Sequence, residues 1–413
     1  MNHRRAYPHS SRRKGMRQGF RKNVRLEEAL DEFLPLFEVV ESESVVLKDA
    51  LGRVAASPVE AERPVPHYDR AAMDGYAVRA EDTHGASEAS PARLELSDGE
   101  IDGGEAGHVH TGSAVPDGAD AVVRVEATEV MGDGVEVSAA LSEGENVAYA
   151  GEDVSEGETV VEEGARLRPS RLGVLRSVGV GTVKVRRKPH VAVVPTGDEV
   201  VTKDPAPGEI VGTNGPMVAE YVERWGGKAT VNDVIPDDED ALRGALKDAA
   251  GEANLVATTG GSSVGDRDLL PDVIDGIGEL LVHGVSVKPG HPVGFGVVEE
   301  TPIVMLPGYP VSCVVNSFEF VRCGVRELLG VEEAPEPATR CMLGEKIPSE
   351  VGARTYTRVV VEEEGDERIA RPVRTKGAGV LSSVAEADGF VVTPESREGY
   401  AEGDEVDVLL WEA

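Results

Sequence analysis

The sequence contains few cysteines, few aromatic residues and few lysines. Only three of its 413 residues are cysteines, and Cys313, Cys323 and Cys341 show no CxxC spacing and no neighbouring histidine. This pattern supports neither a zinc site nor a disulfide framework. We expect the three thiols to be buried as small hydrophobic side chains, because a chain of this length can fill several cores without cross-links.

Several common sequence signatures are also absent. No uncharged apolar run approaches the roughly 18 residues that span a bilayer, so we expect no membrane segment and a cytoplasmic location. No GxGxxG follows a strand-like segment and no GxxxxGK[ST] occurs, which argues against dinucleotide sites and Walker-type phosphate sites. The GxSxG elbow of many hydrolases is missing as well.

Acidic residues far outnumber basic ones. The chain has 75 Asp and Glu against 42 Lys and Arg, a formal net charge of −33, and 31 of the basic residues are arginine. An acidic surface poor in lysine stays soluble in molar salt, where the Debye length falls to about 3 Å. The composition favours a halophilic protein from a salt-rich cytoplasm, and an acidic protein of ordinary origin is the alternative.

The N-terminus has the opposite charge, since the first 26 residues contain nine Arg or Lys and no acid. Arg12, Arg13 and Lys14 suggest a twin-arginine signal, but the residues after them lack its apolar segment. We expect residues 1–23 to form a disordered basic tail, and a start at Met16 is an alternative. A nucleic-acid-binding arm is the other interpretation, although basic tails are common and mostly unspecific.

Hydrophobic spacing divides the rest of the chain into domains. Leu26, Leu30, Phe33 and Leu34 share one face of a predicted helix that ends near Pro35. Short β-branched runs among glycines and aspartates predict a mostly β module at 59–146, inserted into an N-terminal linker domain made of 24–58 and 147–187. Alternating strand and turn patterns predict a small C-terminal β-barrel-like domain at 337–413.

Residues 188–330 alternate apolar strand-like runs with amphipathic helices, which predicts a doubly wound α/β domain. In such sheets, ligands bind beyond the carboxyl ends of the strands, where helix N-termini offer free N–H groups. Three predicted strand ends lead into polar loops: VVPTGDEV, TTGGSSVGDRD and MLPGYPVS. The whole chain is therefore expected to be a multidomain α/β protein.

The last two loops have features of an anion site. Glycines in TTGGSSVGDRD let the backbone approach a ligand and serines add donors, while prolines in MLPGYPVS fix a turn into a helix. An ordinary flexible turn is the alternative for each loop. The residues concerned are Gly260, Gly261, Ser262, Ser263, Pro307, Gly308 and Pro310.

Carboxylates are predicted to gather at the same edge of the sheet. Repulsion among Glu199, Asp237 and Asp268 favours a shared divalent cation that bridges to phosphate oxygens. Helix capping is the alternative role for Asp237 and Asp268. Lys288, in the segment VKPGHP, is expected to supply a positive charge for the ligand.

Eight ordered blocks resemble the signature segments of molybdopterin molybdenumtransferases and of the matching domain of gephyrin. Any one block could arise by chance, but together they cover nearly the whole chain from about residue 24. The blocks are PVPHYDRAAMDGYAVR, HTGSAVPDGADAVV, GEDV, PTGDEV, IPDDEDALR, TTGGSSVGDRD, VKPG and LPGYPVS. The resemblance implies an elongated homodimer, in which the MoaB-like molybdopterin-binding α/β domain of one subunit faces the β module of the other, with dimerisation through the linker domain.

The resemblance also implies roles for individual residues. The implied catalytic residues are Asp74, Thr111, Glu199, Asp237, Asp268 and Lys288, and Glu199, Asp237 and Asp268 would hold Mg²⁺ or Zn²⁺. The implied substrate-binding residues are Gly260, Gly261, Ser262, Ser263, His291, Pro307, Gly308, Pro310, Arg354 and either Ser382 or Ser383. Turn stabilisation is the alternative role for Asp74 and Thr111. Two positions depart from the family's pattern: His291 stands where lysine is common, and Tyr309 where asparagine is common.

The activity that the resemblance implies is the insertion of molybdate or tungstate into molybdopterin-AMP, with release of AMP and active cofactor. Two alternatives are a molybdopterin adenylyltransferase, whose single domain resembles 188–330, and a non-catalytic molybdopterin-binding scaffold. The extra N-terminal segment argues against the first, and the acidic residues with Lys288 argue against the second. Transient contacts with molybdopterin adenylyltransferase and with acceptor apo-enzymes are expected, and contacts with membranes or nucleic acids are not.

The charge distribution predicts that folding depends on salt. Residues 27–413 hold 33 basic and 75 acidic residues, a net charge of −42, so self-repulsion should destabilise the fold at low ionic strength. We expect the melting temperature to rise between 0.1 M and about 2 M KCl, because the Debye length shortens to under about 3 Å. Scanning calorimetry across this range is the measurement, and a constant melting temperature would contradict the prediction.

Overall fold

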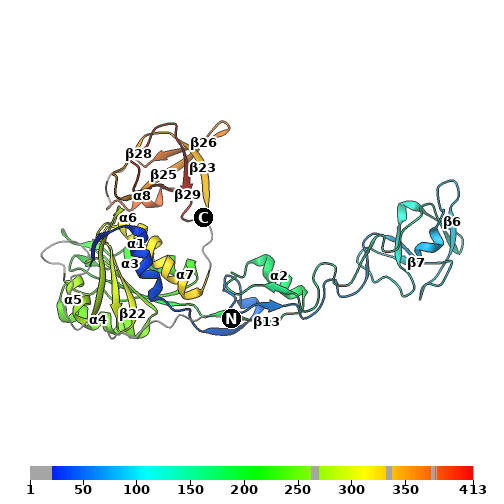
Figure 1. The fold of residues 1–413 in the computed structure, drawn as a ribbon, viewed down its shortest axis with the longest axis horizontal. Coiled ribbons are helices and arrows are strands. Elements are labelled where there is room, and N and C mark those ends of the chain that lie inside the picture. Colours follow the sequence, from blue (N-terminus) through cyan, green and yellow to red (C-terminus); the bar gives the residue numbers. More distant parts are fainter. Residues whose placement is uncertain (1–20, 262–268, 332–336, 374–376, 378, 413) are drawn as a thin grey trace. The chain divides into compact units, whose positions relative to one another are not determined.

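The computed structural model describes residues 21–261, 269–331, 337–373, 377 and 379–412. These residues form two compact units, whose elements are labelled in Figure 1. Unit 1 contains the described residues up to Glu41 and those from Arg187 onward, and unit 2 is Ser42–Arg186. Within the described ranges, no helix is long and apolar enough to cross a membrane.

Unit 1 is built on a seven-stranded sheet in the order β1-β19-β21-β22-β18-β14-β17. β14 pairs in parallel with β17 and β18, and β18 pairs in parallel with β22, whereas β21 is antiparallel to both neighbours. This order confirms the predicted doubly wound α/β domain. The strands are β1 (Arg21–Val24), β14 (His190–Pro195), β17 (Lys228–Val231), β18 (Leu255–Thr259), β19 (Gly278–Val285), β21 (Gly294–Val298) and β22 (Thr301–Leu306).

Helices cover both faces of this sheet. On one face, Leu246 of α4 and Ile274 of α5 belong to the same buried cluster as Val298 of β21. Phe295 has the opposite parity along β21 and so points to the other face, where Phe33 of α1 lies 5.0 Å from it between ring centroids. The helices are α1 (Leu26–Phe33), α3 (Asn214–Trp225), α4 (Glu239–Glu252), α5 (Leu270–Ile277), α6 (Pro310–Asn316) and α7 (Cys323–Leu329), with η1 (Leu34–Leu36) after α1 and the π-helical η5 (Ser317–Arg322) between α6 and α7.

The C-terminal part of unit 1 is a small β-barrel, as predicted. Its strands follow the order β20-β25-β26-β23-β29-β27, and β25 also pairs with β27, which closes the ring. The strands are β20 (Val287–Lys288), β23 (Ala338–Leu343), β25 (Arg354–Glu364), β26 (Glu367–Pro372), β27 (Gly389–Thr393) and β29 (Glu405–Leu409), with the pair β24 (Ile347–Pro348) and β28 (Gly399–Tyr400) and the helix α8 (Ser382–Ala385).

Unit 2 is mostly β structure, which confirms the predicted β-rich N-terminal part. It has a six-stranded sheet in the order β8-β5-β7-β6-β10-β9, three two-stranded ribbons and one α-helix in its described residues. The sheet strands are β5 (Gly75–Val78), β6 (Ala92–Leu96), β7 (Glu105–Val109), β8 (Ala121–Arg124), β9 (Thr128–Met131) and β10 (Gly134–Val137). The other elements are β2 (Ser42–Val46), β3 (Val59–Glu60), β4 (Arg70–Ala71), β11 (Val147–Ala148), β12 (Thr159–Val161), α2 (Pro169–Ser177), β13 (Thr182–Arg186) and the short helices η2 (Leu47–Asp49), η3 (Ala80–Thr83) and η4 (Val125–Ala127).

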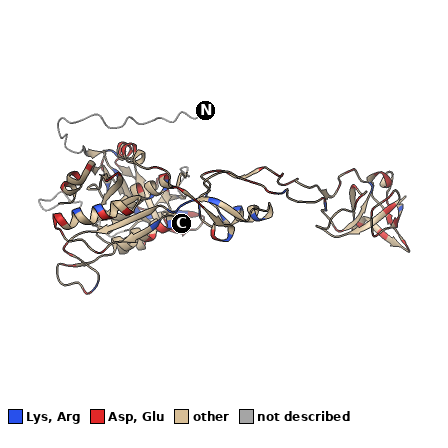
Figure 2. Ribbon diagram, turned by 90° about the horizontal axis from the view of Figure 1, so that it is seen from below, with Lys and Arg blue, Asp and Glu red and all other residues tan. Residues whose placement is uncertain are grey.

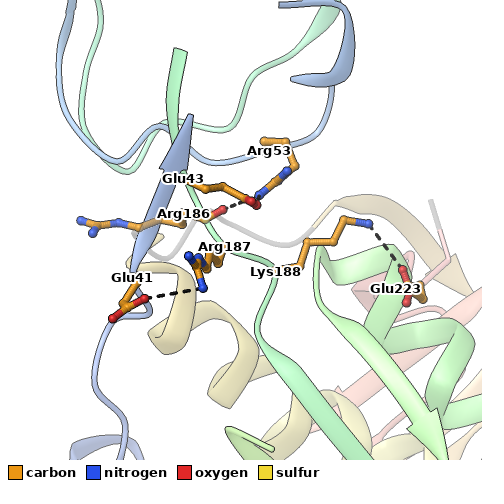
Figure 3. A network of polar contacts seen from close by, with 7 residues as sticks. All are labelled: Glu41, Glu43, Arg53, Arg186, Arg187, Lys188 and Glu223. Atoms are coloured by element: carbon orange, nitrogen blue, oxygen red, sulfur yellow. Dashed lines mark hydrogen bonds and ion pairs between the residues drawn. The ribbon is translucent and has the colours of Figure 1, made fainter. Parts of the chain in front are cut away.

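The chain enters and leaves unit 2 through adjacent antiparallel strands, with Ser42 of β2 opposite Arg186 of β13. Arg53 donates to the Glu43 carboxylate at 2.5 Å and to the Arg186 carbonyl at 2.7 Å (Figure 3). One residue further on, the Arg187 side chain lies 3.6 Å from the Glu41 carboxylate. Arginine side chains thus make hydrogen bonds and ion pairs close to both points where the chain crosses between the two units.

Asp and Glu recur along the helices and loops of both units (Figure 2).

The three cysteines provide no exposed thiol. Cys313 and Cys341 are buried and Cys323 is partly buried, and all three are free thiols. Burial raises the pKa of the Cys313 thiol to about 12, so it stays protonated at neutral pH.

Candidate functional site

The carboxyl ends of β14, β18 and β22 meet at one edge of the unit 1 sheet. The Thr196 amide donates to the Thr259 carbonyl, and the Gly260 amide donates to the Leu306 carbonyl, both at 3.1 Å. Gly260 has a φ of +106°, and a Cβ there would lie 2.5 Å from the Thr196 carbonyl oxygen. A glycine is therefore required where these loops touch. The described residues of the three polar loops predicted from the sequence thus lie side by side.

The first of two hollows at this edge has a volume of about 300 Å³ and is called the inner hollow below. Its floor includes Thr196, Gly260 and Gly308, and Asn214 at the start of α3 donates to the Gly308 carbonyl at 2.7 Å. The remaining described lining residues are Pro195, Glu199, Val200, Ile210, Val211, Gly212, Thr213, Gly215, Thr259, Tyr309, Pro310 and Gly379.

The second hollow, called the acidic hollow below, has a volume of about 680 Å³ and is lined by Asp198, Glu199, Glu209 and Asp237, together with Pro207, Gly208 and Leu269. The Asp237 amide donates to the Asp198 carboxylate at 3.2 Å, and the Asp198 amide donates to the Asp237 carboxylate at 3.4 Å. These reciprocal bonds join the loop after β14 to the loop before α4. Glu199 lines both hollows, so the two adjoin.

In the structure, Asp237 is not the residue that caps helix α4. The side chain of Asp238 accepts from the Ala241 amide and so caps α4. The Asp237 carboxylate is therefore available to line the acidic hollow. Its position beside Glu199 agrees with the sequence expectation that these carboxylates share one edge of the sheet.

The oxygen ligands of the acidic hollow suit Mg²⁺ better than Zn²⁺. Mg²⁺ is usually held by one or two carboxylates and completes its shell with water and phosphate oxygens. Zn²⁺ prefers histidine or cysteine ligands, and neither residue type lines this hollow in the described part of the chain. The described residues contain no cluster of three or more His, Cys, Asp or Glu side chains arranged around a common metal position. A metal here would therefore depend on the ligand for part of its coordination.

Several expected site residues lie outside the described ranges, namely Ser262, Ser263 and Asp268. Their neighbour Gly261 is described and has a φ of +62°, a conformation that favours glycine. Pro307 is buried at the end of β22 and precedes the exposed Gly308, while Pro310 is the first residue of α6.

Lys288 and Arg354 are engaged elsewhere in unit 1. The Lys288 ammonium group pairs with Glu350, and Lys288 lines a separate hollow beside Thr355. Arg354 donates to Glu27 at 2.5 Å, and its Nε lies 3.7 Å from the Glu395 carboxylate. Neither residue is among the described residues that line the inner or the acidic hollow.

His291 and Ser382 also lie apart from the two hollows. The carbonyl of His291 accepts from the Val285 amide, and its ring is next to Gly284. Ser382 is exposed at the start of α8, whereas the neighbouring Ser383 is fully buried and accepts a hydrogen bond from Arg358. Of the two serines that the sequence left open, Ser383 is the one with a fixed side-chain environment.

In unit 2, the structure brings Asp74 and Thr111 together. The Asp74 carboxylate accepts from the Thr111 amide at 2.6 Å and from its hydroxyl at 3.1 Å, while His110 Nδ1 lies 3.7 Å away. These hydrogen bonds, first from the Thr111 amide and then from its hydroxyl, lower the pKa of Asp74. Asp74 of AAMDGYA and His110 and Thr111 of HTGS therefore form an exposed cluster.

Most lining residues of the inner hollow were not predicted as site residues from the sequence, and Asn214 and Gly379 illustrate why. Asn214 was not among the predicted site residues, although GTNGP is a glycine-containing segment that follows a strand, and this is the signal that could have indicated it. Gly379 comes from the C-terminal domain, and a Cβ there would lie 3.4 Å from Tyr309 Cδ1. Its place in the hollow could not be read from spacing, because the two residues are far apart in the chain.

Comparison with known proteins covers almost the whole chain. Residues 24–179 match the MoeA N-terminal region (domain I and II), residues 192–326 a probable molybdopterin binding domain and residues 340–411 the MoeA C-terminal region (domain IV). A putative molybdopterin biosynthesis protein of Methanocaldococcus jannaschii is 36% identical, with 93% of this chain and 95% of that protein covered. The chain belongs to the MoeA family.

Other MoeA relatives agree. The molybdopterin molybdenumtransferase of Bacillus subtilis is 31% identical, with 90% of each chain covered. A crystal structure of a molybdopterin biosynthesis MoeA protein from Pyrococcus horikoshii OT3 superposes with a TM-score of 0.83 at 34% identity, covering 94% of this chain and all of that one. The MoeA fold thus extends over both units. The described residues that line the two hollows belong to the part that matches the molybdopterin binding domain, except Gly379, which belongs to the MoeA C-terminal region.

The lowered pKa of Asp74 predicts a pH-dependent contribution to stability. Ionised Asp74 stabilises its loop above the ordinary aspartate pKa of 3.8, and this contribution is lost as pH falls through the lower pKa of the folded state. The variant Asp74→Asn, which removes the charge, should melt below the wild type at pH 6, and the difference should shrink as pH falls below about 3.8 and disappear below the lowered pKa of the folded state. Calorimetry from pH 3 to 7 measures this difference, with Asp98→Asn as a control at another exposed aspartate of unit 2. A difference that does not change with pH would show that the Asp74 charge does not hold the loop.

Proposed function

We propose that the chain acts in molybdenum cofactor biosynthesis as a transferase that inserts molybdate or tungstate into molybdopterin-AMP and releases AMP. The observation that carries the proposal is the pair of adjoining hollows that share Glu199. One hollow suits a neutral ring and the other suits a metal-bound phosphate, which are the two parts of a pterin nucleotide. The name of the Bacillus subtilis relative, a molybdopterin molybdenumtransferase, supports the same reaction.

In this proposal, Glu199 and Asp237 would hold Mg²⁺ in the acidic hollow, and Asp268, the third carboxylate expected from the sequence, lies outside the described residues. Mg²⁺ would neutralise phosphate charge and polarise the pyrophosphate as a Lewis acid. Without a cation, carboxylates at this position would repel the phosphates, because like charges a few ångströms apart disfavour binding. The chain itself orients the carboxylates: the reciprocal Asp198 and Asp237 hydrogen bonds fix the two loops that bear them.

Lys288 is proposed to supply the positive charge that offsets the charge on the leaving phosphate. It is now paired with Glu350 of the C-terminal domain, at an exposed position where an ion pair contributes little to stability. A phosphate could therefore compete with Glu350 for the ammonium group at little cost. Gly260, Gly261, Gly308 and the neighbouring prolines would let the ligand approach the backbone at the sheet edge.

The rival functions explain less of the chain. A molybdopterin adenylyltransferase would need only the α/β domain, yet the MoeA N-terminal and C-terminal regions are both matched. A non-catalytic scaffold would have no need for Asp237, which leaves capping of α4 to Asp238. The expected contacts with a molybdopterin adenylyltransferase and with acceptor apo-enzymes remain proposals about partners.

The first test is a single-turnover assay with purified molybdopterin-AMP, Mg²⁺ and each oxyanion in turn, in molar KCl, with AMP release measured by chromatography. Asp237→Asn should lower AMP release by at least about 100-fold, because it removes a charged metal ligand, and should leave the melting temperature within about 1 °C of wild type. Asp240→Asn, at an exposed position in the first turn of α4, is the matched control and should turn over normally. Normal turnover of Asp237→Asn, or an equal loss in Asp240→Asn, would count against the metal role.

We also propose that the protein is a homodimer in which Asp74 and Thr111 of one subunit complete the site of the other. This is the arrangement that the family resemblance implies. In it, the exposed Asp74 cluster contributes to the partner's site as well as to the structure of its own loop.

Subunit mixing tests this arrangement. Asp74→Asn and Asp237→Asn should each be inactive alone, but mixed and re-equilibrated subunits should recover about a quarter of wild-type turnover, since half of the dimers would have one intact site. Co-purification of an untagged subunit with an affinity-tagged one confirms that the subunits exchange. If exchange occurs and activity stays absent, both residues act within one chain.

A further inference from the structure

Three exposed apolar side chains of unit 1 line the same hollow. Ile210 is 52% exposed, Val211 is 41% exposed and Tyr309 is 67% exposed, and all three line the inner hollow. Large apolar side chains gathered at the mouth of a hollow indicate a binding site more strongly than the same side chains scattered over the surface. The inner hollow therefore has apolar walls that no other part of the described chain covers.

The apolar walls come from segments that follow β14 and β22, the two strands on either side of β18. In the sheet order, β18 lies between β14 and β22. Ile210 and Val211 form β16 (Ile210–Val211), which pairs with β15 (Val200–Val201) in the segment after β14, whereas Tyr309 follows β22. The hydrogen bond from Asn214 to the Gly308 carbonyl links the two segments. The walls therefore lie on either side of Gly260, which also lines the hollow.

The floor between the walls has polar atoms without partners. Thr196 is 1% exposed and its hydroxyl has no hydrogen-bond partner in the described structure, and the same is true of the Asn214 side-chain carbonyl. Buried polar atoms are normally paired, so unpaired atoms in a hollow point to a ligand that supplies the partner. Because the Asn214 amide group already donates to Gly308, its oxygen is left to accept.

The charge of the inner hollow decides what kind of group fits. Its described lining residues include one carboxylate, Glu199, and no Lys, Arg or His. Among the described residues, an anion would therefore find no positive side chain in the hollow to hold it. A neutral flat ring with N–H groups on one edge matches both the apolar walls and the acceptors on the floor. A volume of about 300 Å³ is at the lower end of the range for ligand pockets, which suits a ring system rather than a whole nucleotide.

We propose that Tyr309 is a specificity-determining residue: with Ile210 and Val211 it encloses the pterin ring of the substrate, while Asn214 and Thr196 accept hydrogen bonds from the ring. The proposal rests on the proposed function and deepens it. The pterin ring fits better than adenine, because it presents an amino group and a ring N–H side by side, whereas adenine has only its amino group. The phosphates would then extend past Glu199 into the acidic hollow.

This assignment gives Tyr309 a role at a position where the family pattern commonly has asparagine. The ring of Tyr309 is held on one side by Gly379, whose Cβ position would lie 3.4 Å from it. An aromatic contact with a bound ring is worth about 2- to 13-fold in affinity, and an asparagine cannot provide it.

The test uses the full chain and pterin itself as a fluorescent probe, titrated without Mg²⁺ or oxyanion. Tyr309→Asn should raise the Kd for pterin about 3- to 10-fold and Tyr309→Phe should keep it within about 2-fold, since the aromatic contact alone is at stake. Tyr149→Asn makes the same exchange at an exposed tyrosine of unit 2 and should change nothing. Thr196→Val should also weaken pterin binding, because it removes an acceptor at constant shape.

A parallel titration with AMP separates the two rings of the substrate. The Kd for AMP should be the same for wild type and Tyr309→Asn. If Tyr309→Asn weakens AMP and leaves pterin unchanged, adenine occupies the inner hollow and the proposal is wrong. It is also wrong if neither Kd changes, or if Tyr149→Asn has the same effect as Tyr309→Asn.

Failure of this proposal is distinguishable from failure of the proposed function. Suppose that the wild type releases AMP from molybdopterin-AMP, but the Kd for pterin is the same for wild type and Tyr309→Asn. That result would overturn the role of Tyr309 and leave the transferase activity supported. Pterin binding that depends on Tyr309, in a protein that releases no AMP with either oxyanion, would support the ring site and overturn the transferase activity.

Discussion

The backbone contact between the loops after β14 and β18 is the constraint on which the rest of the candidate site depends. Parallel strands end at a common edge, but side chains normally keep successive loops apart. At Gly260 there is no side chain, and the Thr196 carbonyl occupies the space that a Cβ would need. This close approach buries Thr196, and both Thr196 and Gly260 line the inner hollow, so the hollow depends on the contact between the loops.

The acidic hollow presents the opposite physical problem. Four carboxylates line it in a chain that is already strongly negative, and its walls include no described basic residue. Clustering of like charges costs free energy unless a cation or salt screens it. A divalent cation that arrives with a phosphate ligand removes this cost locally, and dissolved salt would reduce it over the surface. The inner hollow is thus lined by apolar side chains, whereas the acidic hollow is lined by carboxylates.

The C-terminal barrel is joined to the α/β domain by specific contacts rather than by its linker alone. β20 pairs with β25, Tyr356 donates to Glu319 at 2.7 Å, and Tyr221 donates to Glu412 at 2.5 Å. Burial, followed by the neighbouring Glu319 carboxylate, raises the pKa of Tyr356, so its hydroxyl remains a donor at neutral pH. These contacts fix the domain that brings Gly379 to the side of Tyr309.

The sequence by itself determined the family, the order of domains and the three loops at the sheet edge, because hydrophobic periodicity and short motifs are local properties of the chain. It also placed Glu199 and Asp237 at one edge, since the topology of a parallel sheet forces strand ends together. Only the tertiary structure decided that α1 packs on the α/β sheet through Phe33, that Asp238 rather than Asp237 caps α4, and that Asn214 and Gly379 line the inner hollow. Each of these depends on contacts between residues far apart in the sequence or on the direction of one side chain, and no local pattern specifies either of them.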